Sequence, residues 1–384
     1  MAGPLEGIKV LDLSRVLAGP WAAQTLADLG ADVVKVERPG AGDDTRQWGP
    51  PYFKDGNREI SAYFMTANRG KRSVTADMRT PEGQEFIKKL AARADIVVEN
   101  FKVGGLGKYG LDYTSLKAIN PGLIYCSITG FGQTGPYAKR AGYDLIIQAM
   151  GGLMSITGEP DDVPGGGPQR AGVAVSDLFT GLYSTIGILG ALHHRSVSGE
   201  GQHIDVALLD TQVAMLANQA SSYLVSGTPP ERQGNSHPSI VPYQSFATKD
   251  GHMILAAGND SQFKHFCEAA GMPGLASDER YSTNPNRVAH RAELVPIVAS
   301  IIKGKTTEEW ITVLEGVGVP CGAINKLDAV FANEQVKARG VELLLEGKMP
   351  SVANPIKMSG TPLEFTKAPP HLGADTEDVM KELG

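Results

Sequence analysis

The chain has 384 residues, of which 42% are hydrophobic and 20% are charged. This length exceeds an ordinary domain of roughly 150 residues, so a single small binding module is excluded, and the apolar content excludes a disordered chain. Lys and Arg number 36 and Asp and Glu 42, which gives a formal net charge of −6. We therefore expect no nucleic acid and no membrane as a partner, and a polyanionic ligand must meet a local basic cluster.

Predicted strands and helices alternate along the first half of the chain. Strands are expected at residues 8–13, 33–37, 96–98 and 123–128, and helices at 21–29, 81–92 and 116–119. These segments indicate parallel strands covered by helices, as in a doubly wound α/β domain. The longest apolar-leaning run, 178–192, is interrupted by Thr, Ser and Gly and is too short to cross a bilayer, so we expect a buried helix there.

After an expected helix at 207–224, the character of the sequence changes. Residues 226–242 are rich in proline and typical of a linker. An expected hairpin that turns at Asp250-Gly251 follows at 243–257, and then helices at 261–270, 294–302 and 307–316. The tail after Leu343 is strand-like and Pro-rich. These segments predict a second, smaller α+β domain.

The cysteines and the first residues bear on the compartment. Cys126, Cys267 and Cys321 lie far apart, so we expect neither a disulfide framework nor a zinc site. The adjacent His193 and His194 point in different directions on a helix and seldom share a metal ion. The N-terminal residues lack the basic and apolar regions of a secretory signal. We therefore expect a cytoplasmic protein with no metal.

Basic residues gather where the predicted strands of the first domain end. They are Arg38, Arg46, the stretch 68–72, Lys108 and the pair 139–140. Ligands bind at the carboxyl ends of strands in open α/β sheets, so a phosphate-rich nucleotide fits there, although ordinary solvated side chains remain the alternative. The turn after the first strand, 14–20, is not GxGxxG, which argues against a nicotinamide dehydrogenase.

Asp177 is the most notable acid, because it stands between an apolar segment expected to be a strand, 171–175, and an apolar helix. An isolated carboxylate is costly there. Capping of that helix by Ser176 or Asp177 is the structural alternative, and it is compatible with chemistry, since a helix N-terminus stabilises negative charge. Tyr143-Asp144 is interpreted as a turn and a cap, and the glycine run 164–168 as a lid or an exposed loop.

The sequence resembles the family III coenzyme A transferases over essentially its whole length. The motifs that carry the resemblance are LDLSRVLAGP at 11–20, GADVVKVER at 30–38, NRGKRS at 68–73, DIVVENF at 95–101, SITGFG at 127–132, GYD at 142–144, GEGQ at 199–202 and GNSHP at 234–238. The resemblance implies an interlocked homodimer. It also implies a Rossmann-like large domain, 1–224, a small domain with its linker, 225–330, and a return segment, 331–384, that completes the large domain.

The resemblance also assigns residues. Asp177 matches the catalytic, nucleophilic aspartate of the family. Positions that line the coenzyme A site are matched by Val16, Ala18, Arg38, Asn68, Lys71, Arg72, Asn100, Phe101 and Lys108. We accordingly expect CoA to pass from an acyl-CoA to a free carboxylic acid through an aspartyl anhydride and an aspartyl–CoA thioester, with no permanently bound cofactor. The sequence of 237–244 and 258–260 most resembles family members that use succinyl-CoA and dicarboxylic acids such as glutarate. Formyl transfer is not favoured, because the formyl-transferring members carry a glycine lid where this chain has residues 234–238.

Two other classes remain open at this point. An α-methylacyl-CoA racemase shares the fold and keeps the aspartate, but it uses a histidine where this chain has Tyr143, and a phenol with a pKa of about 10 is a poor base near neutral pH. A non-catalytic CoA-binding protein would not need a carboxylate at position 177.

Overall fold

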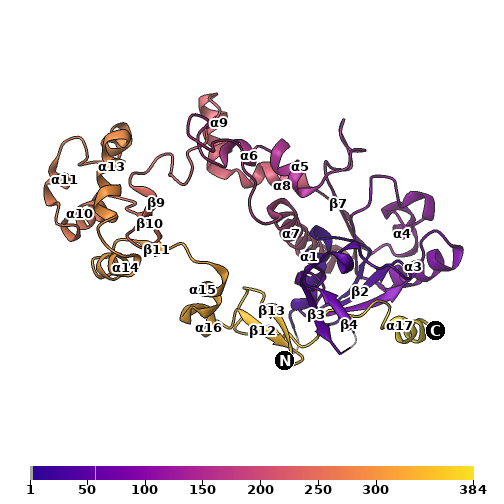
Figure 1. Ribbon diagram of the computed structural model, residues 1–384. Coiled ribbons are helices and arrows are strands. Elements are labelled where there is room, and N and C mark those ends of the chain that lie inside the picture. The colour runs from indigo at the N-terminus through magenta and orange to yellow at the C-terminus, as the bar shows by residue number, and fades with distance from the viewer. Residues whose placement is uncertain (1–2, 57) are drawn as a thin grey trace. The chain divides into compact units, whose positions relative to one another are not determined.

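The computed structural model describes residues 3–56 and 58–384 and contains two compact units (Figure 1). The first unit comprises residues 1–153, 170–228 and 334–384, and the second comprises 154–169 and 229–333. The expected boundaries near 225 and 331 lie close to these limits. The segment 154–169, which we had expected within the large domain, belongs to the second unit instead.

A six-stranded parallel sheet forms the centre of the first unit. Its strands are β1 (Lys9–Asp12), β2 (Asp32–Glu37), β5 (Lys71–Thr75), β6 (Ile96–Glu99), β7 (Ile124–Thr129) and β8 (His203–Ala207). They lie in the order β5-β2-β1-β6-β7-β8, with every neighbouring pair parallel. The predicted parallel α/β sheet is therefore confirmed. The strand order reverses between β1 and β6, and such a reversal leaves a crevice at the carboxyl ends of the strands.

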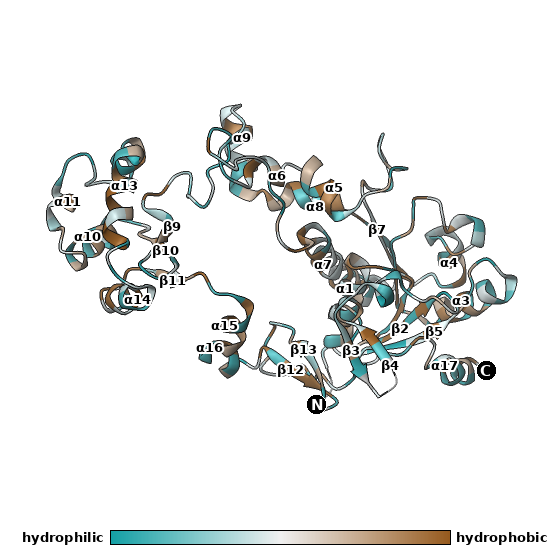
Figure 2. Cartoon of the chain, in the orientation of Figure 1, coloured by the Kyte–Doolittle hydropathy of each residue, from teal (hydrophilic) through white to brown (hydrophobic). Residues whose placement is uncertain are grey.

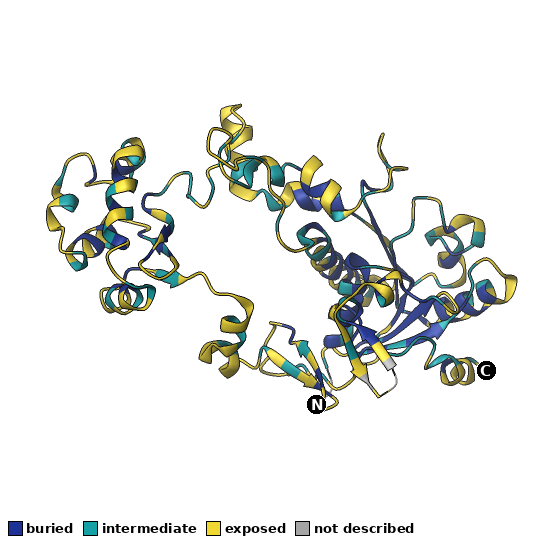
Figure 3. Cartoon of the chain, in the orientation of Figure 1, coloured by how far each residue is buried: buried dark blue, intermediate teal, exposed yellow. Residues whose placement is uncertain are grey.

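Helices pack on both faces of this sheet. The helices of the first unit are α1 (Ala18–Asp28), α2 (Ala62–Thr66), α3 (Pro81–Arg93), α4 (Tyr113–Ile119), α5 (Asp144–Met150), α7 (Val175–Ser198), α8 (Leu208–Met215), α9 (Ala217–Ser226), α16 (Glu334–Ala338) and α17 (Thr376–Leu383), and α6 (Leu153–Ile156) lies at the unit boundary. One apolar cluster, with Ile188 of α7 and Val98 of β6, fills one face, and another, with Ile87 of α3 and Val97 of β6, fills the other. Figure 3 shows most strands of the central sheet as buried and α9 as largely exposed.

Helix α7 is longer than the predicted run. It crosses close to α1, because a Cβ added to Gly181 would lie 2.7 Å from the carbonyl oxygen of Ala18, so only glycine fits at the crossing. In its most apolar 18-residue window, 39% of the residues are buried. Its 24 residues are long and apolar enough to cross a membrane, a test that core helices of soluble proteins also pass. The expected buried helix is thus present, but only one of its faces is covered.

The second unit is built on an antiparallel sheet in the order β11-β10-β9, with β9 (Tyr243–Ala247), β10 (His252–Ala256) and β11 (Cys321–Ala323). Its helices are α10 (Asp260–Ala269), α11 (Pro273–Ser277), α12 (Asn284–Ala289), α13 (Arg291–Ile302), α14 (Thr307–Gly316) and α15 (Leu327–Ala332). Phe246, Phe263 and Trp310 belong to its apolar core. The predicted hairpin and the three predicted helices are confirmed.

Some elements differ from expectation. The helix expected at 207–224 is preceded by strand β8 and is broken at Leu216–Ala217 into α8 and α9, where Ala217 has a φ of +45°. Strand β5, the hairpin of β3 (Tyr52–Asp55) and β4 (Arg58–Ser61), and helix α17 had not been predicted. The strand-like tail forms a second hairpin, β12 (Glu342–Leu345) and β13 (Met349–Val352).

Candidate active site

A cavity of about 680 Å³ lies in the crevice at the carboxyl ends of the central strands. Its walls come from the turn after β1, the loop after β6, the end of β7, the start of α5 and the first turn of α7. A Cβ added to Gly130, just after β7, would lie 2.5 Å from the backbone of Gly142, so these two glycines let the loop after β7 press against the start of α5. This contact brings Tyr143 and Asp144 to the cavity that Asp177 also lines.

Asp177 stands in the first turn of α7. The helix begins at Val175 with Ala174 as its N-cap residue and has no side-chain cap of its own, so the expected capping by Ser176 or Asp177 is wrong. Residues 171–174 form no strand, contrary to expectation. The Asp177 carboxylate is therefore not used as a cap and faces the cavity beside the N-terminus of the helix.

Asp144 supplies the cap from another helix. Its Oδ1 accepts the backbone N–H of Ser176 at 2.8 Å and that of Asp177 at 3.4 Å, while its Oδ2 accepts the Gln148 amide at 2.6 Å. Burial and the nearby charge of Asp144 raise the pKa of Asp177 to about 7. A carboxylate with so high a pKa is poorly solvated and correspondingly reactive.

An aromatic pair, Trp48 and Tyr63, lies on the same side and was missed by sequence reasoning. Burial and the charges of Asp177, Asp144 and Asp43 raise the pKa of Tyr63. The indole of Trp48, which lines the cavity, meets the Tyr63 ring edge-on with centroids 4.9 Å apart. No local pattern distinguishes these two residues from core aromatics.

The turn after β1 forms the opposite wall. Val16 has a φ of +71°, a strained conformation for a β-branched residue. Asn100 fixes the turn from β6, because its Oδ1 accepts the N–H of Arg15 at 2.9 Å and its Nδ2 donates to the carbonyl of Arg15 at 2.6 Å. The predicted ligand-site residues Val16, Ala18, Asn100, Phe101 and Lys108 all line this cavity with Asp177.

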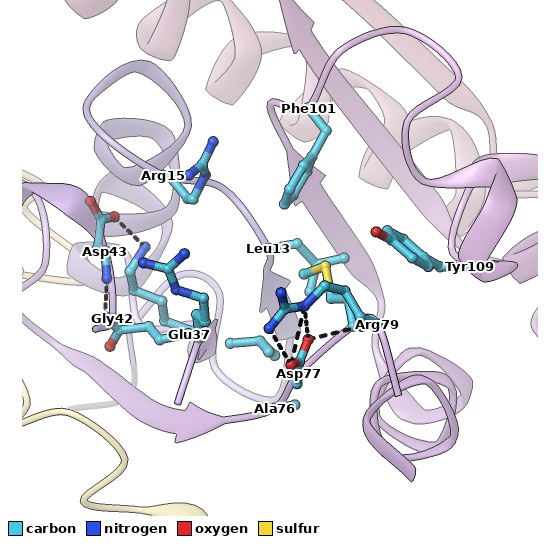
Figure 4. Close-up of a pocket in the computed structure, with 14 residues that line it drawn as sticks. Leu13, Arg15, Glu37, Gly42, Asp43, Ala76, Asp77, Arg79, Phe101 and Tyr109 are labelled. Atoms are coloured by element: carbon cyan, nitrogen blue, oxygen red, sulfur yellow. Dashed lines mark hydrogen bonds and ion pairs between the residues drawn. The ribbon is translucent and has the colours of Figure 1, made fainter. Parts of the chain in front are cut away.

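A second cavity of about 250 Å³ shares Arg15, Phe101 and Tyr109 with the first. Figure 4 shows Phe101 pointing into it between Arg15 and Tyr109. Arg38, predicted to bind phosphate, lines this cavity, and so does Arg79, which sequence reasoning had not singled out and whose guanidinium contacts Asp77 at 2.7 Å. Arg15, Arg38 and Arg79 therefore line this cavity next to the main one, together with the acids Glu37, Asp43 and Asp77 and the apolar side chains of Leu13 and Phe101.

The other predicted ligand-site residues lie elsewhere. Asn68 is 0% exposed and bonds Lys71, which is 3% exposed and pairs with Asp12 at 2.8 Å. Burial lowers the pKa of Lys71 to about 8. Arg72 pairs with Asp32 and Glu382, beside the amino ends of β1 and β2. These three side chains are bound to protein partners, and none of them lines either of the two cavities.

The two lid candidates both lie in the second unit and are joined to each other. The backbone N–H of Gly234 donates to the carbonyl of Gly158 at 3.0 Å, and that of Gly167 donates to the carbonyl of Glu159 at 3.2 Å. Arg232 also bonds the carbonyls of Ser155 and Glu159. The glycine run 164–168 and the segment 234–238 therefore belong to one connected loop cluster.

The described part of the chain shows no cluster of potential metal ligands. Among residues 3–56 and 58–384, no group of three or more His, Cys, Asp or Glu side chains is placed to hold a metal ion.

Comparison with known proteins identifies the family. The model of CoA-transferase family III matches residues 5–376. The chain is 54% identical to the succinate–glutarate CoA-transferase of Agrobacterium fabrum, over 99% of this chain and 96% of that one, and 45% identical to the succinyl-CoA:glutarate CoA-transferase of Homo sapiens, over 99% and 86%. A crystal structure of a CAIB/BAIF family protein from Brucella suis matches with a TM-score of 0.91 and 52% identity over the full length of both chains. The resemblance inferred from the motifs is therefore confirmed, and the chain belongs to CoA-transferase family III.

Proposed function

We propose that this protein transfers CoA from succinyl-CoA to glutarate or a similar dicarboxylic acid, with Asp177 as the nucleophile. The observation that carries the proposal is the position of Asp177, a carboxylate that lines the large cavity beside a helix N-terminus. Family membership makes the protein an enzyme of CoA transfer, and the names of its relatives support the choice of acids. The racemase alternative gains no support from these relatives.

The proposed reaction proceeds through anhydride and thioester intermediates on Asp177. The Asp177 carboxylate attacks the thioester carbonyl, the C–S bond breaks, and a mixed anhydride and the CoA thiolate result. The thiolate attacks Cγ of Asp177, which releases the first acid and leaves an aspartyl–CoA thioester. The acceptor carboxylate then attacks Cγ and expels the thiolate, which attacks the new anhydride to form the product acyl-CoA and restore Asp177.

Nearby groups favour these steps. The positive end of the α7 dipole stabilises the negative charge of Asp177 and of the oxyanion that forms at its carbonyl, while Asp144 holds the N–H groups of Ser176 and Asp177. The high pKa of Asp177 makes it a better nucleophile than an ordinary aspartate, because poorly solvated charge is readily shared with an electrophile. Anhydrides hydrolyse, so an enclosed cavity protects the intermediates from water.

The two adjoining cavities suit the two ends of an acyl-CoA. We place the adenosine phosphates in the smaller cavity, where Arg15, Arg38 and Arg79 offer charge and Phe101 an apolar face, and the acyl group in the larger one beside Asp177. Val16, Ala18, Asn100 and Lys108 line the larger cavity and would meet the pantetheine. The same proposal gives Asn68, Lys71 and Arg72 an indirect role through the strands that they hold.

We further propose a cytoplasmic homodimer. Its support is the exposed apolar surface of three helices, in which Ile186 of α7 is 63% exposed and Val225 of α9 is 90% exposed. Figure 2 shows hydrophobic residues on α5 and α7, and Leu145 and Ile146 of α5 belong to the same exposed set. Covering such a surface with a second copy removes it from water. Interlocking of the two chains and insertion of the small domain follow the family resemblance.

A panel of free acids tests the substrate assignment directly. With succinyl-CoA as the donor, we expect C4 to C6 dicarboxylates to be faster acceptors than monocarboxylates of equal length, and Asp177→Ala to lower every rate at least about a thousandfold. Equal rates for dicarboxylates and monocarboxylates would remove the proposed acids but leave CoA transfer intact. Full transfer by the Asp177→Ala protein would remove the nucleophile.

A further inference from the structure

Glu99, the last residue of β6, is buried next to the site without lining either cavity described above. Its side chain is 5% exposed, and its Oε2 accepts the backbone N–H of Phe101 at 2.7 Å. This hydrogen bond closes the turn in which the Asn100 side chain bonds both the backbone N–H and the carbonyl of Arg15. Arg15 in turn lies over the Phe101 ring, with its guanidinium carbon 5.5 Å from the centroid. The geometry of the turn therefore depends on the Glu99 carboxylate.

Two further side chains hold Glu99 from behind. Burial raises the pKa of Glu99, and a hydrogen bond from the Ser127 hydroxyl opposes this rise. The same hydroxyl lies 2.9 Å from Nε2 of His203. The strand register explains this alignment, because Glu99 on β6 pairs with Ser127 on β7, and His203 lies on β8, the next strand. His203 stacks on Tyr113 with ring centroids 5.0 Å apart. An aromatic ring thereby fixes the far end of the chain.

The direction of these hydrogen bonds follows from the chemistry of the groups. An ionised carboxylate only accepts hydrogen bonds, so the Ser127 hydroxyl donates a hydrogen bond to Glu99. The Ser127 oxygen is then free to accept a hydrogen bond from the Nε2–H of His203. A continuous chain runs from His203 through Ser127 and Glu99 to the Phe101 N–H. Each group is satisfied only while its neighbours stay in place.

This chain opens into a different cavity from the reaction. Glu99, Ser127 and His203 line a space of about 240 Å³ behind the loop after β6. Lys102 and Val103 of that loop line both this rear cavity and the cavity of Asp177. The loop therefore separates the two cavities, and Glu99 bonds it from the side of the rear cavity.

We propose that Glu99 is a positioning residue for the acyl-CoA site, held in place by Ser127 and His203, and that it fixes Asn100 and Phe101 in the geometry that binds CoA. The inference rests on the proposed function, in which Asn100 and Phe101 contact acyl-CoA. Glu99 itself touches no reacting atom. Its loss frees the turn while Asp177, on α7, remains where it was, so binding of acyl-CoA weakens and the chemistry of bound substrate is largely kept.

Steady-state kinetics of Glu99→Ala, Glu99→Gln and Ser127→Ala test this role. For Glu99→Ala we expect the KM for succinyl-CoA to rise roughly tenfold or more, with the KM for the free acid unchanged and kcat within about threefold of the parent. Glu99→Gln keeps an amide oxygen for the Phe101 N–H and should restore most of the loss. Ser127→Ala should give an intermediate rise. Thr114→Ala, which lines the same rear cavity outside the hydrogen-bond chain, is the matched control and should equal the parent.

The outcomes separate this proposal from the proposed function. If the parent enzyme forms no covalent CoA adduct, the nucleophile is wrong, whatever the kinetics of the Glu99 variants show. A Glu99→Ala enzyme that forms the adduct at saturating succinyl-CoA but shows the parental KM would overturn the positioning role. If Glu99→Ala does not fold, a parental KM in Ser127→Ala and a lack of any difference between it and Thr114→Ala would overturn it equally.

Discussion

At position 177, stability and reactivity make opposed demands on one carboxyl group. The group must be ionised to attack a thioester, yet burial and the neighbouring Asp144 raise its pKa to about 7. Asp144 cannot simply be dispensed with, because its Oδ1 caps the helix that carries Asp177. The same acid therefore orients the nucleophile and increases its basicity.

This coupling predicts a pH dependence. Because Asp177 attacks only when ionised, kcat/KM for succinyl-CoA should fall by about tenfold per pH unit below pH 7. Asp144→Asn keeps an oxygen that can cap α7 but removes the negative charge, so its acid limb should move to lower pH. A pH–rate profile of both enzymes measures the shift. An acid limb that does not move in Asp144→Asn would show that Asp144 is not the charge that acts on Asp177.

The raised pKa also predicts a stability difference. The folded protein binds the Asp177 proton more tightly than the unfolded chain, whose value is 3.8, so the free energy of unfolding falls as pH rises from about 4 to 7. Asparagine cannot ionise, and Asp177→Asn should therefore be more stable than the parent by about 1–3 kcal/mol at pH 8, with the difference vanishing near pH 4. Denaturant unfolding at both pH values provides the measurement. A variant that is less stable than the parent at pH 8 would contradict the prediction.

At the scale of the elements, the carboxyl ends of the strands organise the site. The sequence predicted this edge because basic residues follow its strands, and Arg38 after β2 does line a cavity there. Arg72 looked equivalent in the sequence because strand β5 had not been recognised. It is the second residue of β5 and therefore lies at the opposite edge, beside the amino ends of the strands. The direction of a strand decides which cations can meet a ligand at this edge.

These two arginines make a matched pair for a test. Arg38→Ala should raise the KM for acyl-CoA about tenfold or more and leave the KM for the free acid unchanged, since a phosphate contact is lost. Arg72→Ala should keep the parental KM but lower the melting temperature, because ion pairs to Asp32 and Glu382 are lost. Kinetics and thermal unfolding of both variants distinguish the roles. A larger KM effect at Arg72 than at Arg38 would reverse the assignment.

Elements that carry a local signal in the sequence were predicted most closely. The helices expected at 81–92 and 307–316 match α3 and α14, and both begin at a local signal: Pro81 opens α3 after the Thr80 cap, and Thr306 and Glu309 form a capping box on α14. Strand β8, HIDVA, escaped notice because it is short, polar and half exposed at the sheet edge. The link from Asp144 to Asp177 spans 33 residues and depends on tertiary packing, so no local pattern could reveal it.

At the scale of the whole molecule, the first unit leaves apolar helix surface uncovered. Ile186 lies on the exposed face of α7, and a protein that remained a monomer in water would leave this face and that of α9 solvated. Helix α7 meets the length and composition of a membrane span, but core helices of soluble proteins meet them too. We propose the interface.

Light scattering after gel filtration tests this proposal. The parent protein, without detergent, should have twice the mass of one chain, and Ile186→Asp should shift the population toward monomer because it buries a charge in the proposed interface. The purified protein should also need no detergent to remain in solution. A stable monomer, or a protein that stays soluble only with detergent, would contradict the proposed homodimer.

The carboxyl group of Asp177 should become covalently attached to CoA during turnover. Mass spectrometry of the intact protein after brief incubation with succinyl-CoA measures this directly. We expect a species heavier by one CoA minus water, which hydroxylamine removes and which maps to Asp177 in the digested protein. Efficient turnover without any such adduct, also under rapid acid quench, or an adduct that persists in Asp177→Asn, would contradict it.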